Sequence, residues 1–371
     1  MTDRRTELMA RVGNIQQWGG TRLVRLEDGP EAGVRAVEFR TAAGLELGVL
    51  VDRGFDIGWF RHRGRSAVWH SPTGFVGPWF REVEGLGFLR TFQGGLVVTA
   101  GLDHILFPQD DPNDTYNYPG RPGGTSYGLH GRASGTPATL RGHGETWDGD
   151  TCTLFAAGEV RQTGAIAENL VLRRRVEVDL FGSEVRWVDT VVNEAHYPTP
   201  HMLLYHMNLG APLLDEASEL VLPSSRITWR TPGAPEDADA HLAFHEPRAG
   251  FLEEAYAHDL VAGDDGTVTV ALLNRHEPDA PWGLRLMYDH DAFPNFLQWR
   301  YLDAGTYVVG LEPSTNDVRG RQAARDDGSL IILEPGESRE YRTSVAVLDG
   351  AEACDAIVDR NRAVLERSAR Q

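Results

Sequence analysis

Apolar and polar residues alternate along many short stretches of this chain, and this period of two is that of a half-buried β-strand. The alternation is clearest at 34–52, 170–195, 265–274, 283–290 and 329–348. Within 170–195 it resumes after the turn sequence DLFGSE, which is typical of a β-hairpin. The 41 glycines supply many turn positions between these stretches. The pattern therefore predicts a chain built mostly of strands.

Helical spacing is found only near the two ends. Residues 3–12 fit a short helix, and 351–370 place Ala356, Ile357, Val364 and Leu365 on one face. Regularly spaced strands without helices between them indicate a sandwich or barrel rather than βαβ units. We predict one all-β domain over 1–371, a large antiparallel β-sandwich, with a short lead at 1–17 and a C-terminal helix at about 351–370.

Two long polar segments interrupt the strands. Residues 108–128 are rich in Gly, Pro and Asp, and 232–247 are acidic and contain proline. Long segments of this composition are expected to be surface loops, and such loops often surround an active site.

The composition limits the possible binding partners and the cellular compartment of the protein. The formal net charge of -18 argues against a nucleic-acid or anionic-membrane surface, both of which need concentrated Lys and Arg. Cys152 and Cys354 lie far apart, which fits a reducing compartment better than a disulfide scaffold. The start of the chain lacks the apolar stretch of a signal peptide, and no run of 18 apolar residues occurs. We expect a cytoplasmic protein with a small-molecule partner; oligomeric state is not readable.

Three residues far apart in sequence offer acid–base chemistry: His130 in YGLHGR, His206 in TPHMLLYHMNLG and Glu312 in GLEPSTN. Each lies at or near the end of an apolar, strand-like run. Two imidazoles and a carboxylate are suited to moving protons at the anomeric carbon of a sugar. A structural role is the alternative for each: a turn histidine, a core histidine and a solvated strand-end glutamate.

Arginines provide a second set of candidates. Arg90 lies between apolar residues and before two glycines, a setting suited to binding a hydroxyl or a ring oxygen, with a buried ion pair as the alternative. Arg53 and Asp56 in VDRGFDIGW are interpreted as a structural ion pair.

As a set, these segments resemble the galactose mutarotase (aldose 1-epimerase) superfamily, and more closely its DUF4432 branch of aldose epimerase-like proteins. LHGR (129–132) is similar to the LHGG of mutarotases, TPHMLLYHMNLG (199–210) to their second histidine segment, and GLEPSTN (310–316) to their late glutamate. DRGFDIGW (52–59), HSPTG (70–74), FQGGLVVTAGLDH (92–104) and GLEPSTNDVRGR (310–321) are similar to the DUF4432 branch.

The resemblance implies a galactose mutarotase-like supersandwich and an isomerase that interconverts sugar anomers without a cofactor or metal. Glu312 would act as the base and His206 as the acid. His130 and Arg90 would bind the sugar ring, and Arg132 and Gln298 would contact its hydroxyls. The chain also departs from the family pattern, because no match to the aspartate that holds ring hydroxyls lies between His206 and Glu312. The sugar is therefore not identified.

Two other functions stay open on the residues alone. A metal-dependent sugar isomerase would use His130, His206, Glu312 and His201 as ligands, although no local metal motif is present. A non-catalytic carbohydrate-binding protein would have no need for an acid–base pair.

Overall fold

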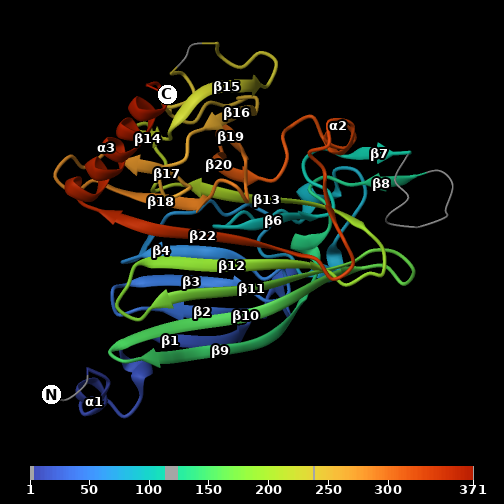
Figure 1. The fold of residues 1–371 in the computed structure, drawn as a ribbon. Helices are drawn as coiled ribbons and strands as arrows, with labels where there is room; N and C mark the ends of the chain where they lie inside the picture. Colours follow the sequence, from blue (N-terminus) through green and yellow to red (C-terminus); the bar gives the residue numbers. More distant parts are fainter. Residues whose placement is uncertain (1–3, 113–123, 237–238, 371) are drawn as a thin grey trace.

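Antiparallel sheets dominate the computed structural model, which describes residues 4–112, 124–236 and 239–370 (Figure 1). A five-stranded sheet has the order β1 (Gly20–Arg25), β2 (Arg35–Arg40), β3 (Leu45–Leu50), β4 (Asp56–His62) and β5 (Arg65–Ser66). An eight-stranded sheet has the order β14 (Ser218–Val221), β17 (Thr267–Asn274), β18 (Trp282–Asp289), β22 (Ser338–Asp349), β12 (Glu184–Asn193), β11 (Asn169–Asp179), β10 (Thr151–Thr163) and β9 (Ala138–Asp148).

A third large sheet carries the segments that sequence analysis singled out. Its order is β15 (Ser224–Arg230), β16 (Glu254–Leu260), β19 (Asn295–Asp303), β20 (Thr306–Ser314), β13 (Thr199–Gly210) and β21 (Ile331–Leu333), with β6 (Val98–Leu102) also paired to β13. A separate two-stranded antiparallel sheet pairs β7 (Gln109–Asp111) with β8 (Thr125–Tyr127). The helices are α1 (Arg4–Met9), α2 (Arg321–Asp326) and α3 (Ala351–Ser368).

The predicted all-β sandwich with short terminal helices is confirmed. The stretch 170–195 forms the hairpin of β11 and β12, and 351–370 forms α3. One face of α3 packs Cys354 and Ile357 against the eight-stranded sheet. The short helix α2 was not predicted, because six residues in a charged segment carry too little periodicity to be recognised.

The main core lies between the eight-stranded sheet and the other two large sheets. It contains alternate residues of strands from all three, such as Phe39 of β2, Val176 of β11 and Leu311 of β20. This shared core buries one face of each sheet. Side chains on the opposite face of the third sheet form a separate apolar cluster that includes Leu204 and Leu297.

A charged network lies inside the main core. Arg174 of β11 is directly opposite Asp189 of β12, and its guanidinium donates to both carboxylate oxygens at 2.8 and 2.5 Å. The Tyr205 hydroxyl of β13 donates to Asp189 at 2.6 Å. Arg174 also donates to Asp56 of β4 at 3.2 Å, so the network connects all three large sheets.

Two expectations about loops and ions need correction. The Arg53 guanidinium is not paired with the Asp56 carboxylate; it donates to the carbonyls of Val76 and Thr91, while Asp56 pairs with Arg174. The segment 232–247 is not only a surface loop, because Phe244 enters the main core. Of the segment 108–128, the structure describes the two ends as β7 and β8, and residues 113–123 lie outside the described residues.

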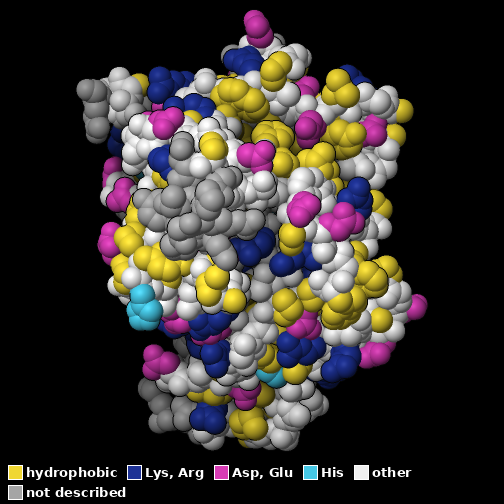
Figure 2. All heavy atoms as spheres, turned by 90° about the vertical axis from the view of Figure 1, so that its right-hand side faces the viewer, with side chains coloured by type: hydrophobic (Ala, Val, Ile, Leu, Met, Phe, Trp, Pro, Cys, Tyr) yellow, Lys and Arg dark blue, Asp and Glu magenta, His cyan; other side chains and the backbone are white. Residues whose placement is uncertain are grey.

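The surface carries charges of both signs. On the face shown in Figure 2, Lys and Arg side chains are interspersed with Asp and Glu rather than gathered into one basic patch. Among the described residues, no helix is long and apolar enough to cross a membrane.

Replacing Arg174 with methionine should lower the free energy of unfolding by about 3–5 kcal/mol, because it leaves Asp189 and Asp56 buried without their cation. Urea denaturation followed by circular dichroism measures this loss. The control is Arg173→Met on the same strand, whose half-exposed side chain pairs with Glu194 and should contribute less than about 1 kcal/mol. Equal effects of the two substitutions would contradict a special role for the buried network.

Candidate active site

Strand register brings His206 and Glu312 together. In the pairing of β13 with β20, Met207 is opposite Leu311 and Asn208 is opposite Gly310, so His206 lies across from Glu312 on the same face. The Nε2 atom of His206 is 3.3 Å from Oε1 of Glu312. Tyr205 and Leu311, the preceding neighbours, point into the main core. The pair therefore lies on the face of the third sheet that is turned away from this core.

Gly310 makes room for the carboxylate of Glu312. A Cβ atom at this position would lie 2.6 Å from Oε1 of Glu312. Any side chain there would displace the carboxylate that faces His206. Glycine at position 310 is thus required for the Glu312 carboxylate to face His206.

His130 is held beside the pair by the tight loop LHGR. Its backbone is in the left-handed region, with φ 57°, and the following Gly131 has φ 71°. The His130 amide donates to the Leu106 carbonyl at 2.9 Å, and its carbonyl accepts from the Gly101 amide at 3.0 Å. A Cβ at Gly131 would lie 2.7 Å from the Gly101 carbonyl oxygen. The close approach that Gly131 permits is therefore to β6.

Aromatic rings surround the two imidazoles. The rings of His130 and His206 are 5.4 Å apart and approach edge to face. Phe88 lies 4.9 Å from the His130 ring, and Phe92 and Trp299 lie 5.0 and 5.3 Å from the His206 ring. The three aromatic rings could make apolar contacts with the C–H groups of a bound molecule. Sequence analysis did not identify Phe88.

Burial controls the protonation of the pair. Glu312 is 1% exposed and His206 is 5% exposed. Burial raises the pKa of the Glu312 carboxyl well above its usual value, and the charge of Glu253 adds to this effect. Burial lowers the pKa of His206 to about 3 and that of His130 well below its usual value. Burial thus favours the form of the pair in which the carboxyl group holds the proton and the imidazole is neutral.

Several polar atoms of this site have no hydrogen-bond partner among the described residues. They are Oε1 of Glu312, Nδ1 of His206 and Nδ1 of His130. Buried polar atoms are nearly always bonded in proteins, and unpaired ones call for an explanation. These three atoms on neighbouring side chains could bond a polar ligand.

The other predicted binding residues are not brought to this pair by any contact among the described residues. Gln298 is opposite Leu311, on the core side of the third sheet, where it donates to the His241 carbonyl at 2.7 Å. Arg90 has a side chain that is 67% exposed and pairs with Glu82 at 2.5 Å. Arg132 pairs with Glu168 and lies 3.7 Å from Asp103. Their roles as substrate-binding residues stay predictions.

His201, treated as a further metal ligand in one alternative, is committed to structural bonds. Its Nδ1 is 2.7 Å from the Leu102 carbonyl and its Nε2 is 2.6 Å from the Tyr341 hydroxyl. Within the described ranges, no three His, Cys, Asp or Glu side chains are grouped as metal ligands would be.

The family model described as a domain of unknown function, DUF4432, matches residues 31–347. The chain belongs to the DUF4432 family. No curated protein matches it.

Solved structures similar to this DUF4432 protein share its fold. A candidate aldose 1-epimerase from Klebsiella pneumoniae has a TM-score of 0.80 at 22% identity, over 93% of this chain and 87% of that one. A galactose mutarotase-like protein from Clostridium acetobutylicum has a TM-score of 0.56 at 12% identity, over 89% and 98%. A galactose 1-epimerase from Lactobacillus acidophilus has a TM-score of 0.54 at 15% identity, over 89% and 99%. The expected galactose mutarotase-like fold is thus confirmed.

The buried carboxyl of Glu312 should make this DUF4432 protein less stable as pH rises. The unfolded chain releases this proton near pH ~4.3, whereas the folded chain keeps it until its raised pKa is reached. Over that window stability falls by up to about 1.4 kcal/mol per pH unit from this group. Glu312→Gln removes the effect, so the variant should gain stability relative to the wild type as pH increases.

Urea unfolding of both proteins across this range measures the difference. The matched control is Glu352→Gln, an exposed glutamate in the first turn of α3. The same pH dependence in Glu352→Gln would show that burial of Glu312 is not the cause of the effect. A constant difference between Glu312→Gln and the wild type would show that the carboxyl is ionised in the folded protein.

Proposed function

We propose that this protein is a sugar mutarotase or epimerase of the aldose 1-epimerase type, acting on the anomeric carbon by acid–base ring opening. The observation that carries the proposal is the 3.3 Å approach of His206 and Glu312, both buried and both with an unpaired polar atom. Fold alone does not establish activity. The chemistry of this pair is therefore the main support.

The proposed reaction moves two protons. Glu312 takes the proton of the C1 hydroxyl while His206 delivers a proton to the ring oxygen. The bond from C1 to the ring oxygen breaks and the C1 carbonyl forms. Rotation about the C1–C2 bond and the reverse transfers give the other anomer, so no proton is gained or lost. The two oxygens share one carbon, which suits an acid and a base only 3.3 Å apart.

The protonation of the free site fits this scheme. The reaction needs one proton on the pair, and burial favours the form in which Glu312 holds it and His206 is neutral. Hydroxyl groups that donate to Glu312 would favour its ionised form and shift the proton to His206. His130 would bind the ring, and its neutral imidazole supplies a donor for the charge that develops on the ring oxygen.

Nearby charge supports a neutral sugar rather than a uronic acid or a sugar phosphate. Trp299, whose ring contacts His206, donates from Nε1 to Glu253 at 3.2 Å. The same carboxylate raises the pKa of Glu312. A second negative group beside the base would repel an anionic substrate.

Glu312→Gln and His206→Asn should each lower the rate of anomer exchange by about 10²–10⁴-fold, the usual contribution of one acid or base. NMR exchange spectroscopy on a panel of anomerically equilibrated aldoses measures the rate and identifies the sugar. The matched controls are Glu352→Gln and His196→Asn, both exposed; each should retain wild-type rates.

A chelator separates the remaining alternatives. Exchange that survives chelator and is lost in both site variants supports the metal-free mechanism. Exchange that requires a divalent ion supports a metal-dependent isomerase. Binding without exchange for every sugar tested supports a non-catalytic carbohydrate-binding protein.

His130 and Arg90 should behave differently as binding residues. His130→Asn should lower kcat/KM by at least about tenfold, because the imidazole lies beside His206. Arg90→Ala should change it less than about threefold, because its exposed guanidinium is paired with Glu82. Steady-state anomer exchange measures both. A large loss for Arg90→Ala would show that the segment carrying Arg90 rearranges to reach the sugar.

A further inference from the structure

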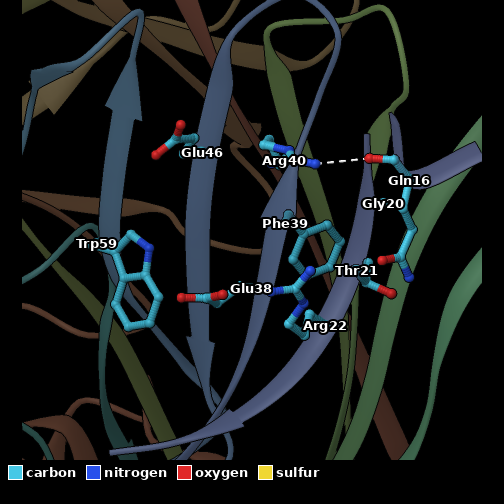
Figure 3. Close-up of a pocket in the computed structure, with 9 residues that line it drawn as sticks. All are labelled: Gln16, Gly20, Thr21, Arg22, Glu38, Phe39, Arg40, Glu46 and Trp59. Carbon is cyan, nitrogen blue, oxygen red and sulfur yellow. Dashed lines mark hydrogen bonds between the residues drawn. The ribbon is translucent and has the colours of Figure 1, made fainter. Parts of the chain in front are cut away.

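A polar hollow lies on the five-stranded sheet, apart from the candidate active site. It has a volume of about 230 Å³, and its lining includes Arg22, Glu38, Glu46 and Trp59 (Figure 3). These residues belong to β1, β2, β3 and β4, and none of them takes part in the acid–base site. The outward face of this sheet is therefore a place where a second ligand could be recognised.

Register aligns these side chains in a row. Arg22 is opposite Glu38, Glu38 is opposite Gly48, and Gly48 is opposite Trp59. A Cβ at Gly48 would lie 2.0 Å from the Trp59 ring, so the indole lies directly over this glycine. In Figure 3, Glu38 lies between the indole and the guanidinium of Arg22. The sheet thus presents an aromatic ring with a carboxylate and a guanidinium beside it.

The charged side chains of this hollow are not bonded to one another. Among the described residues, the side chains of Arg22, Glu38 and Glu46 have no hydrogen bond and no ion pair, although Arg22 and Glu38 are direct cross-strand neighbours. Exposed charges on the eight-stranded sheet behave differently. There Arg161 and Arg173 both pair with Glu194, at 2.6 and 2.7 Å. Donors and acceptors at the hollow are therefore left available to a ligand.

We propose that this hollow is a second saccharide-binding site, separate from the acid–base pair. The C–H face of a sugar ring packs on an indole, whose ring is a large apolar surface with a negative face. Sugar hydroxyls donate to the carboxylates of Glu38 and Glu46 and accept from Arg22. Charges of both signs favour an uncharged ligand, and the small volume suits one ring rather than a long chain.

Methyl glycosides are suitable probes, because their blocked anomeric carbon cannot undergo ring opening. Saturation-transfer NMR with methyl β-D-glucopyranoside and methyl β-D-galactopyranoside would be compared among the wild type, Trp59→Ala and Glu38→Ala. The control for tryptophan loss is Trp147→Ala, a half-buried indole on β9. Thermal melting shows that each variant is folded.

We expect at least one glycoside to bind about tenfold more weakly to Trp59→Ala and to Glu38→Ala than to the wild type or Trp147→Ala. His206→Asn should retain this binding, and Trp59→Ala should retain anomer exchange, so the site is tested independently of the proposed reaction. Unchanged binding in both hollow variants would overturn the proposal. Binding lost in His206→Asn, or no binding of either glycoside to any variant, would overturn it as well.

Discussion

The buried pairing of Arg174 with Asp189 constrains the rest of this structure. The two side chains face each other across β11 and β12 inside an apolar core, and Asp189 also accepts from Tyr205 of β13. A buried charge without partners is far more costly than one held by several hydrogen bonds. β13 must therefore point Tyr205 into the core. Because side chains alternate along a strand, its neighbour His206 is turned to the opposite face.

The same alternation fixes the other half of the acid–base pair. Leu311 packs into the main core, so Glu312 takes the outer face and meets His206. A shift of β20 by one residue would exchange these positions, bury the carboxylate in the core and separate it from the imidazole. The candidate chemistry thus depends on the register of β13 and β20. That register depends in turn on which side chains can be buried in the main core.

Burial has opposite consequences in the charged network of the core and at the candidate active site. In the core network, burial is offset by direct pairing between charges, and the network connects three sheets. At the candidate site, burial leaves polar atoms unpaired and drives Glu312 and His206 toward their neutral forms. Unpaired polar groups in a protected place reduce stability but can favour binding of a matching ligand, and pKa shifts of this kind are common at catalytic sites.

The sequence by itself determined the fold class, the terminal helices and the hairpin at 170–195, and it predicted the three residues of the candidate site. These features are local, because alternation, helical spacing and short motifs are visible within a few residues. The sequence also contains a signal of the buried charged network. In β11 and β12 every second residue is buried and most of these residues are apolar, but Arg174 and Asp189 occupy two of these positions, which indicates a buried pair. Only the tertiary structure decided that Gln298 faces the core, that Arg90 is exposed, and that Trp59 and Glu38 lie in one row. Those placements depend on which strands pair and in which register, and this follows from packing between distant segments rather than from any one of them.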